Sequence, residues 1–306
     1  MWRRPAARSH ALLRAAAVGR RGTSSQLAAR LAVIGAGRMA EAMLGGIMQK
    51  GMQPARDTHV FDTNSKRMDL CRDRWGMATH DTPDSCVEDA DLVLLAVKPQ
   101  HMTVVLEAVS RQIQPNALVV SIAAGCPLSM FQDALPTASV VRSMPNTPAM
   151  VNEGMTVWTA TESCCAKQRA QAQQLLTSFG DEIYVDDENF LDVATAIVGS
   201  GPAYAFMFME AMIDTGVHMG LPRETTEKLV LKTVQGSVAY AQSSSRHITA
   251  LRNDITSPAG TTAAAIYSSE RSGFRTAIAD SIWAAYRRSL ELGGKNSNVG
   301  PDRSKS

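Results

Sequence analysis

The sequence predicts an α/β fold in which a doubly wound parallel sheet is followed by an all-helical domain. Two observations carry this prediction. From Leu31 to about residue 160, short apolar runs rich in β-branched residues alternate with helical patterns, which is typical of strands buried on both faces of a parallel sheet. After Asp186 the pattern is almost wholly helical, with breaks at turns rich in Gly, Ser and Pro.

The expected elements follow in chain order. Strands are expected at residues 31–34, 58–61, 92–97, 118–122, 139–142, 155–158 and 182–185, separated by helices at about 38–50, 65–75, 100–111 and 165–179. Five further helices are expected at about 188–198, 203–219, 222–242, 262–271 and 274–292. These patterns predict a sheet domain at 31–186, a helical domain at 187–293 and a polar, frayed tail at 294–306.

The helix expected at about 203–219 is apolar nearly all round, with Phe206, Met207 and Phe208 in succession. Such a helix needs burial on every side, from its own domain or from another subunit. Its methionines are therefore interpreted as core or interface residues rather than as a cofactor site.

The first thirty residues differ from the rest in composition. They contain seven arginines and no Asp or Glu, and the first acidic residue of the chain is Glu41. An arginine-rich, acid-free and potentially amphipathic segment is typical of an organelle transit peptide. We therefore expect a transit peptide at residues 1–30 and a mitochondrial location, with a plastid or the cytoplasm as alternatives. A basic tail without any targeting role remains the other interpretation.

Composition excludes several classes of function. The whole chain has a formal net charge of +2. Without the seven arginines of the first thirty residues the net charge is −5, so a basic nucleic-acid-binding surface is not expected. No stretch reaches about 18 uninterrupted apolar residues, so we expect no membrane partner. The five cysteines are odd in number and without C-x-x-C spacing, and the six histidines are scattered, which predicts reduced thiols and no metal.

A glycine-rich turn follows the first expected strand. The sequence Ile34-Gly35-Ala36-Gly37-Arg38-Met39-Ala40 matches Gly-x-Gly-x-x-Ala between a strand and a helix. In a Rossmann-type domain the first glycine permits the tight turn, the second lets a pyrophosphate reach the helix start, and the small third residue allows close packing of helix on strand. The sequence therefore predicts a binding site for NADPH or NADH.

Asp62 ends the second expected strand. A carboxylate there can hold a ribose diol and repel a 2′-phosphate, which favours NADH, whereas Asn64 and its neighbours Lys66 and Arg67 can together hold a 2′-phosphate. Asp62 is alternatively a cap for the following helix. The cofactor is therefore expected to be NADPH or NADH, with Asp62 and Asn64 among its contacts.

Two further turns are expected to lie beside the nicotinamide half of the cofactor. Ala96-Val97-Lys98-Pro99 follows the third long strand and Ala123-Ala124 follows the fourth, so both lie at carboxyl ends of strands. Lys98 either meets a phosphate or amide there, or is an ordinary solvent-facing loop lysine.

Small and hydroxyl-bearing residues gather ahead of the expected helix at 262–271. The segment Thr256 to Thr262 contains Ser257, Gly260 and Thr261, and a helix start of this kind leaves unpaired N–H groups and a partial positive charge. Alone, it reads either as an ordinary capped helix start or as a site for a carboxylate or phosphate.

Taken together, these motifs closely resemble those of pyrroline-5-carboxylate reductases. The resemblance covers about residues 31–292 and rests on a series of segments in order, namely Gly35–Ala40, Ala96–Pro99, Ala123–Gly125, Met144–Pro148, Gly199–Tyr204 and Thr256–Thr262. It implies that NAD(P)H reduces the cyclic imine of Δ1-pyrroline-5-carboxylate to L-proline.

The resemblance also assigns residues. It places the substrate carboxylate on Ser257, Gly260, Thr261 and Thr262, puts Asn146 beside the imine ring, and implies dimers in which the helical domain of one chain completes the site of the other. Thr262 or water is expected to deliver the proton. Three positions depart from the family pattern: Ala259 replaces a usual Gly, His247-Ile248 replaces His-Pro, and Pro83 replaces a frequent Asn.

Two other functions remain as alternatives. A related Rossmann reductase acting on another imine or a keto acid predicts a Lys or Arg near the reacting carbon, and residues 256–262 contain neither. A non-catalytic nucleotide-sensing module predicts loss of the hydroxyl-rich segment, which this chain retains.

Overall fold

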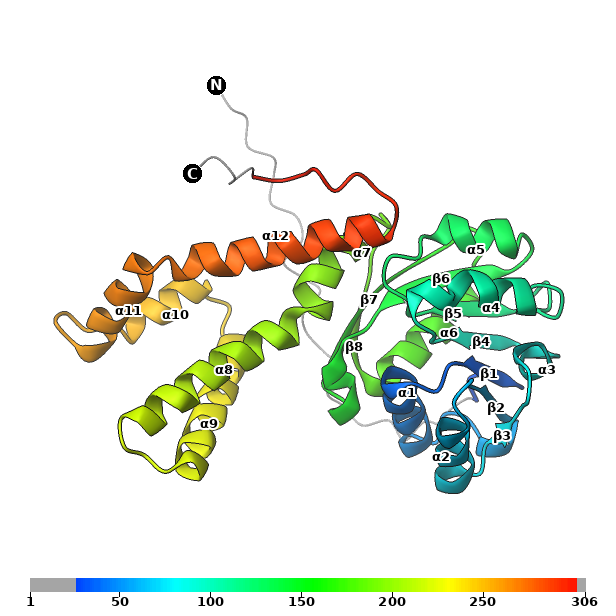
Figure 1. Cartoon of the computed structure of the whole chain (residues 1–306), viewed down its shortest axis with the longest axis horizontal. Helices are drawn as coiled ribbons and strands as arrows, with labels where there is room; N and C mark the ends of the chain where they lie inside the picture. The colour runs from blue at the N-terminus through cyan, green and yellow to red at the C-terminus, as the bar shows by residue number, and fades with distance from the viewer. Residues whose placement is uncertain (1–25, 302–306) are drawn as a thin grey trace.

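The computed structural model describes residues 26–301. An eight-stranded sheet with helices on both faces forms one part of the molecule, and an arm of helices extends from it (Figure 1). We call residues 190–292 the helical arm.

The sheet has the strand order β3-β2-β1-β4-β5-β6-β7-β8. The strands are β1 (Leu31–Ile34), β2 (Thr58–Phe61), β3 (Ala78–Thr79), β4 (Leu92–Leu95), β5 (Leu118–Ser121), β6 (Ser139–Met144), β7 (Gly154–Ala160) and β8 (Gly180–Tyr184). The first six are parallel, as predicted. β7 runs antiparallel to β6, with β8 parallel to β7, because the short connection between β6 and β7 holds only the 3-10 turn η3 (Thr147–Val151) and no crossover helix.

Helices cover both faces of this sheet. They are α1 (Arg38–Gln49), α2 (Ser65–Trp75), α3 (Pro83–Val87), α4 (Met102–Val109), α5 (Leu128–Ala134) and α6 (Ala166–Leu176), with 3-10 turns η1 (Ala55–Asp57), η2 (Pro99–His101) and η4 (Thr177–Phe179). α1, α2 and α6 pack on one face and α3, α4 and α5 on the other. The sequence did not predict β3, α3 or α5, which are each seven residues or fewer.

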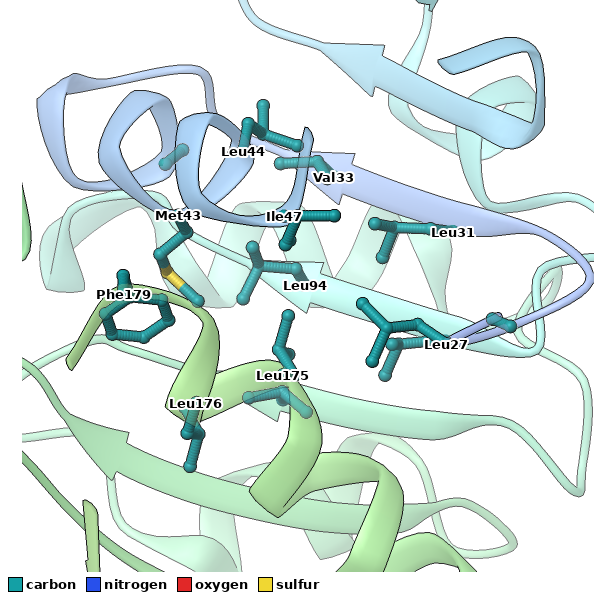
Figure 2. Packing of buried hydrophobic residues seen from close by; sticks show 14 of the residues in the cluster. Leu27, Leu31, Val33, Met43, Leu44, Ile47, Leu94, Leu175, Leu176 and Phe179 are labelled. Carbon is teal, nitrogen blue, oxygen red and sulfur yellow. The ribbon is translucent and has the colours of Figure 1, made fainter. Parts of the chain in front are cut away.

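Alternate residues of the central strands point to opposite faces of the sheet, and all are buried. In β1, Leu31 and Val33 pack toward α1, whereas Ala32 and Ile34 pack toward α3 and α4. Figure 2 shows the first of these cores, where side chains of α1 and of the α6–η4 segment meet those of β1 and β4. Burial on both faces explains why the strands read as continuous apolar runs.

The helical arm begins with α7 (Phe190–Ala194), the π-helical turn η5 (Thr195–Gly199) and α8 (Gly201–His218). It continues with α9 (Arg223–Gln242), α10 (Ile248–Asp254), α11 (Thr261–Arg271) and α12 (Phe274–Leu292). α10 was not predicted. It starts at His247, whose side chain accepts a hydrogen bond from the Thr249 amide at 3.2 Å.

The arm exposes much of its apolar surface within a single chain. No residue of α8 is buried, and Phe206 and Met207 are 63% and 67% exposed. The helical stretch from Phe190 to His218 has 29 residues, and an 18-residue window within it has a mean hydropathy of 1.3, so by length and composition alone it is apolar enough to cross a membrane. The mean hydropathy detects this helix, whereas the search for an uninterrupted apolar run did not. An exposed apolar surface of this kind is typical of an interaction site.

Residues outside the two expected ends of the folded chain, before residue 31 and after residue 293, are also packed against it. Leu27 and Ala28 are buried, and the Leu27 amide donates to the Met52 carbonyl at 3.0 Å. The folded part of the chain therefore includes residues that the sequence placed in the transit peptide, whose residues 1–25 lie outside the described part. At the other end, residues 294–301 lie along α12 and are not frayed, because Arg287 donates to the carbonyls of Val299 and Pro301.

Candidate functional site

The turn between β1 and α1 has the geometry of a nucleotide cradle. Gly35 has φ +95°, and a Cβ there would lie 2.9 Å from the Ala96 carbonyl, so no other residue fits. Gly37 has no heavy atom within 4 Å of the position of its Cβ, which leaves open space at the start of α1. Among the described residues, no side chain caps this helix start. Its amides are therefore available to a pyrophosphate, which fits the predicted cofactor.

The sheet brings the other predicted cofactor residues to the same edge. β1 pairs with β2 on one side and β4 on the other, so the connections diverge there and open a crevice at the carboxyl ends of the strands. A cavity of about 230 Å³ opens at this point, lined by Gly35, Asp62, Val97 and neighbours that include Ile34 and His101. The Ala96–Pro99 turn follows β4 directly, and Ala123–Ala124 come one residue after the end of β5. Lys98 is exposed, which leaves both of its interpretations open.

The Asp62 carboxylate binds the backbone on both sides of this crevice. One oxygen accepts from the Ala36 amide at 2.7 Å and the other from the Asn64 amide at 2.8 Å. Asn64, rather than Asp62, caps α2 by accepting from the Lys66 amide at 3.1 Å. Asp62 therefore orders the glycine-rich turn, a role that the sequence did not predict.

We expect Asp62→Ala to weaken binding of NADH and NADPH alike, by about tenfold, because the loss of two charge-assisted hydrogen bonds loosens the turn that both cofactors share. Titration of nucleotide fluorescence measures both affinities. A loss confined to NADH would show instead that the carboxylate acts mainly on the ribose diol.

Asn146 forms hydrogen bonds at both ends of its side chain. Its Nδ2 donates to the Val198 carbonyl at 3.3 Å and its Oδ1 accepts from the Met155 amide at 2.9 Å. It thus ties the loop after β6 to β7 and to the base of the arm. Its predicted contact with the substrate stays a prediction.

The hydroxyl-rich segment forms the turn between α10 and α11. Gly260 begins α11 in an extended conformation, and among the described residues no side chain caps it. Ser257 and Thr261 are exposed and Thr262 lies on the first turn of the helix. The start of α11 therefore presents unpaired amides and hydroxyls to solvent, which suits a carboxylate.

The structure does not bring this turn to the nucleotide crevice of its own chain. α10 and α11 lie at the far end of the arm from the sheet (Figure 1). The predicted substrate residues Ser257, Gly260, Thr261 and Thr262 are therefore together, and so are the cofactor residues, but the two groups are apart within one chain.

Ala259 holds a conformation that favours glycine, with φ +57°. Its side chain is exposed, so the cost of this conformation is not offset by packing. We expect Ala259→Gly to stabilise the protein by about 1 kcal/mol, because a left-handed residue with a Cβ is strained. Thermal or denaturant unfolding measures the change, and a lower stability of the variant would contradict it.

A buried ion cluster joins the sheet to the arm. The Arg142 guanidinium on β6 is 3% exposed and contacts Glu188 at 2.7 Å and Asp192 at 3.3 Å. Asp192 on α7 also accepts from Ser289 at 2.9 Å and contacts Lys295 at 2.7 Å. Burial opposes ionisation of Asp192, but the hydrogen bond from Lys295 and the charge of Arg142 hold its pKa below the usual value. In the sequence, the only feature that pointed to this buried ion cluster was an arginine within an apolar strand.

Within residues 26–301, no three His, Cys, Asp or Glu side chains gather where they could hold a metal ion. All five cysteines have free thiols, and four of them are buried. The nucleotide crevice and the α11 turn hold the residues that the sequence assigns to the cofactor and to the substrate carboxylate.

Comparison with known proteins identifies both parts of the chain. Residues 188–292 match a family model described as pyrroline-5-carboxylate reductase dimerisation, and residues 30–125 match one described as NADP oxidoreductase, coenzyme F420-dependent. A pyrroline-5-carboxylate reductase of Pseudomonas aeruginosa is 40% identical over 264 residues, which are 86% of this chain and 96% of that protein.

Solved structures agree. The pyrroline carboxylate reductase of Plasmodium falciparum, with NADP bound, has a TM-score of 0.81 at 27% identity and covers 88% of this chain and 100% of its own. The Coxiella burnetii pyrroline-5-carboxylate reductase has a TM-score of 0.78 at 31% identity, covering 86% and 98%. The relatives align with this chain over nearly their full length, which includes the NADP-binding sheet domain and the helical dimerisation domain. The chain therefore belongs to the pyrroline-5-carboxylate reductase family.

Proposed function

We propose that this protein uses NADPH, or alternatively NADH, to reduce Δ1-pyrroline-5-carboxylate to L-proline. The observation that carries the proposal is the pair of open helix starts, α1 and α11, each of which lacks a side-chain cap among the described residues. One suits the pyrophosphate of a dinucleotide and the other a small carboxylate. The names of the relatives agree with this substrate.

The chain's own residues bind and orient the cofactor and the substrate. The α1 start and the turn at Gly35–Ala40 hold the pyrophosphate, and Ala96–Pro99 and Ala123–Ala124 border the nicotinamide half. Ser257, Gly260, Thr261 and Thr262 hold the substrate carboxylate and so fix the ring. NADPH, when bound, supplies the hydride that the imine carbon receives. A protonated imine is already electrophilic, so alignment of the reacting atoms provides much of the acceleration.

We infer that each site is completed by a second copy of the chain. Two observations support this: the α11 turn lies far from its own crevice, and the arm leaves large apolar residues exposed. Pairing of two arms would bury this surface and carry each α11 turn to the partner's crevice. The family is named for dimerisation through the same residues, 188–292.

Thr262 is proposed to help deliver the proton to the ring nitrogen, with water as the alternative. Thr262→Val is nearly isosteric and removes only the hydroxyl, so it is expected to lower kcat by about tenfold or more with little change in nucleotide binding. Steady-state kinetics at saturating nucleotide measure this. Unchanged kcat would leave water as the donor.

A mitochondrial location is proposed from the arginine-rich start of the chain, with plastid and cytoplasmic locations as alternatives. Because Leu27 and Ala28 are buried in the sheet domain, a removable leader would end before Leu27. Fusion of residues 1–26 to a fluorescent reporter tests the proposal: import into mitochondria supports it, and a diffuse signal contradicts it.

The activity is tested by NADPH and NADH oxidation with pyrroline-5-carboxylate against a panel of keto acids. We expect turnover with the imine and none with the keto acids. Nucleotide binding without turnover of any substrate would favour a sensing module instead, and turnover of keto acids alone would favour a different reductase.

A further inference from the structure

The segment Gly294–Pro301, which we call the C-terminal strap, folds back along α12. Its first contact is at the base of the arm, where the Lys295 ammonium lies 2.7 Å from Asp192 Oδ2 and 3.0 Å from Asn189 Oδ1. The Lys295 amide also donates to the Leu290 carbonyl at 2.9 Å. The strap therefore supplies one of the two cations that neutralise the buried Asp192.

The second contact of the strap is farther back along α12, at half-buried side chains. The Arg287 guanidinium donates to the carbonyls of Val299 and Pro301, each at 2.9 Å. Gly300 has φ +82°, and a Cβ there would lie 2.5 Å from the Trp283 ring, so only a glycine lets the strap lie this close.

The base of α12 also touches the loop after β5, which carries predicted cofactor residues. Gly125 immediately follows the predicted cofactor residues Ala123 and Ala124, and a Cβ on it would lie 2.8 Å from Leu292 Cβ. The end of α12 thus contacts the loop after β5 through Leu292 and the Asp192 cluster through Ser289, and Lys295 of the strap contacts the same Asp192.

The other end of α12 carries the substrate turn. There Arg275 contacts Glu270 of α11 at 2.7 Å, and α11 begins at Gly260. α12 has 19 residues and so spans about 28 Å. A tilt of about 10° at its base would move the far end by about 5 Å, whereas misplacement of reacting groups by about 1 Å can cost about a hundredfold in rate.

We propose that the C-terminal strap is a positioning element that sets the direction of α12 and thereby places the substrate turn against the crevice it serves. The strap lies beyond residues 188–292, the part of the arm that matches the family's dimerisation domain. The inference rests on the proposed function, because its main measurement is the KM for the imine.

The test uses the full-length protein and five variants, one of which is a control outside the strap. Lys295→Met removes the cation and Lys295→Arg restores it. A chain ending at Gly294 removes the strap from Lys295 onward, and a chain ending at Pro301 keeps it. Lys167→Met is a matched control on α6, where the lysine is exposed and lies on the sheet domain.

We expect Lys295→Met and the chain ending at Gly294 to raise KM for pyrroline-5-carboxylate by about tenfold, the factor that corresponds to about 1.4 kcal/mol, with unchanged affinity for NADPH. Lys295→Arg, Lys167→Met and the chain ending at Pro301 should behave as wild type. Hydrogen exchange, which does not depend on turnover, should become faster along α12 and at residues 256–262 only in the two strap variants.

Two results would overturn the proposal. One is an unchanged KM and unchanged hydrogen exchange in both strap variants. The other is a loss of NADPH affinity as large as the rise in KM for the imine, because a general disturbance of the fold would then explain the kinetics. A wild-type protein inactive toward the imine would instead refute the proposed function, and the hydrogen-exchange comparison would still decide whether the strap holds α12.

Discussion

Replacing Gly37 with aspartate is expected to abolish NADPH binding while the chain stays folded. Gly37 has φ −66°, and no heavy atom lies within 4 Å of where its Cβ would be, so a side chain fits without strain. Aspartate is also a favoured residue at a helix N-cap, so α1 should not lose stability. Its charge, however, would occupy the space meant for the pyrophosphate.

Gly37→Asn is the matched control, because it has the same shape without the charge. We expect a loss of affinity of at least about a hundredfold for Gly37→Asp and about tenfold for Gly37→Asn, since juxtaposed like charges cost several kcal/mol. Nucleotide fluorescence titration measures both, with thermal unfolding as the check on folding. Equal affinities for the two variants would contradict an anion site at this helix start.

Arg142→Met is expected to destabilise the protein by about 3–5 kcal/mol, because it leaves the buried Asp192 carboxylate and Glu188 with one cation fewer. Methionine keeps much of the arginine's length and removes its charge. Arg223→Met is the control: Arg223 is paired with Asp214 at 2.6 Å, but both side chains are about half exposed, so little change is expected. Denaturant unfolding measures both variants.

The ion cluster around Asp192 also makes the stability of the folded protein depend on pH. The pKa of Asp192 is lowered in the folded protein, so its ionisation contributes stability above its unfolded pKa, near 3.9. That contribution is lost as the pH falls through the lower folded value. The stability difference between wild type and Asp192→Asn should therefore be constant near neutrality and shrink below about pH 4. A difference that persists there would assign the effect to packing.

The sequence was sufficient for the architecture because the buried strands and long helices have strong periodic patterns. β1, β2 and α2 have the predicted bounds. β3, α3, α5 and α10 were missed because two to seven residues are too few to show a period. The reversal of β7 was missed because direction depends on the connection and not on the strand itself.

The glycine-rich turn was predictable because its chemistry is local. The hydrogen bonds from the Ala36 and Asn64 amides to Asp62 were not predicted, because they depend on two connections meeting at one edge, and the ribose contact of Asp62 stays a prediction. The Arg142 cluster joins residues that lie up to 153 positions apart, from Arg142 to Lys295, and no local pattern contains it. The packed strap was mistaken for a frayed tail because its composition is polar.

We propose that a nucleotide crevice from one chain and a carboxylate-binding turn from another form one imine-reducing site. Two variants that damage different halves test it. Gly37→Asp damages the crevice, and Thr261→Glu places a negative charge in the exposed turn at the start of α11. Each variant alone should be inactive.

The deciding measurement is the activity recovered when these two variants are co-expressed and assembled together, assayed as NADPH oxidation with pyrroline-5-carboxylate. If sites are shared, a mixed dimer contains one site with both halves intact, and random assembly should restore about a quarter of wild-type activity. No activity in mixed dimers whose formation has been verified would contradict the account, because each site would then need both halves from one chain.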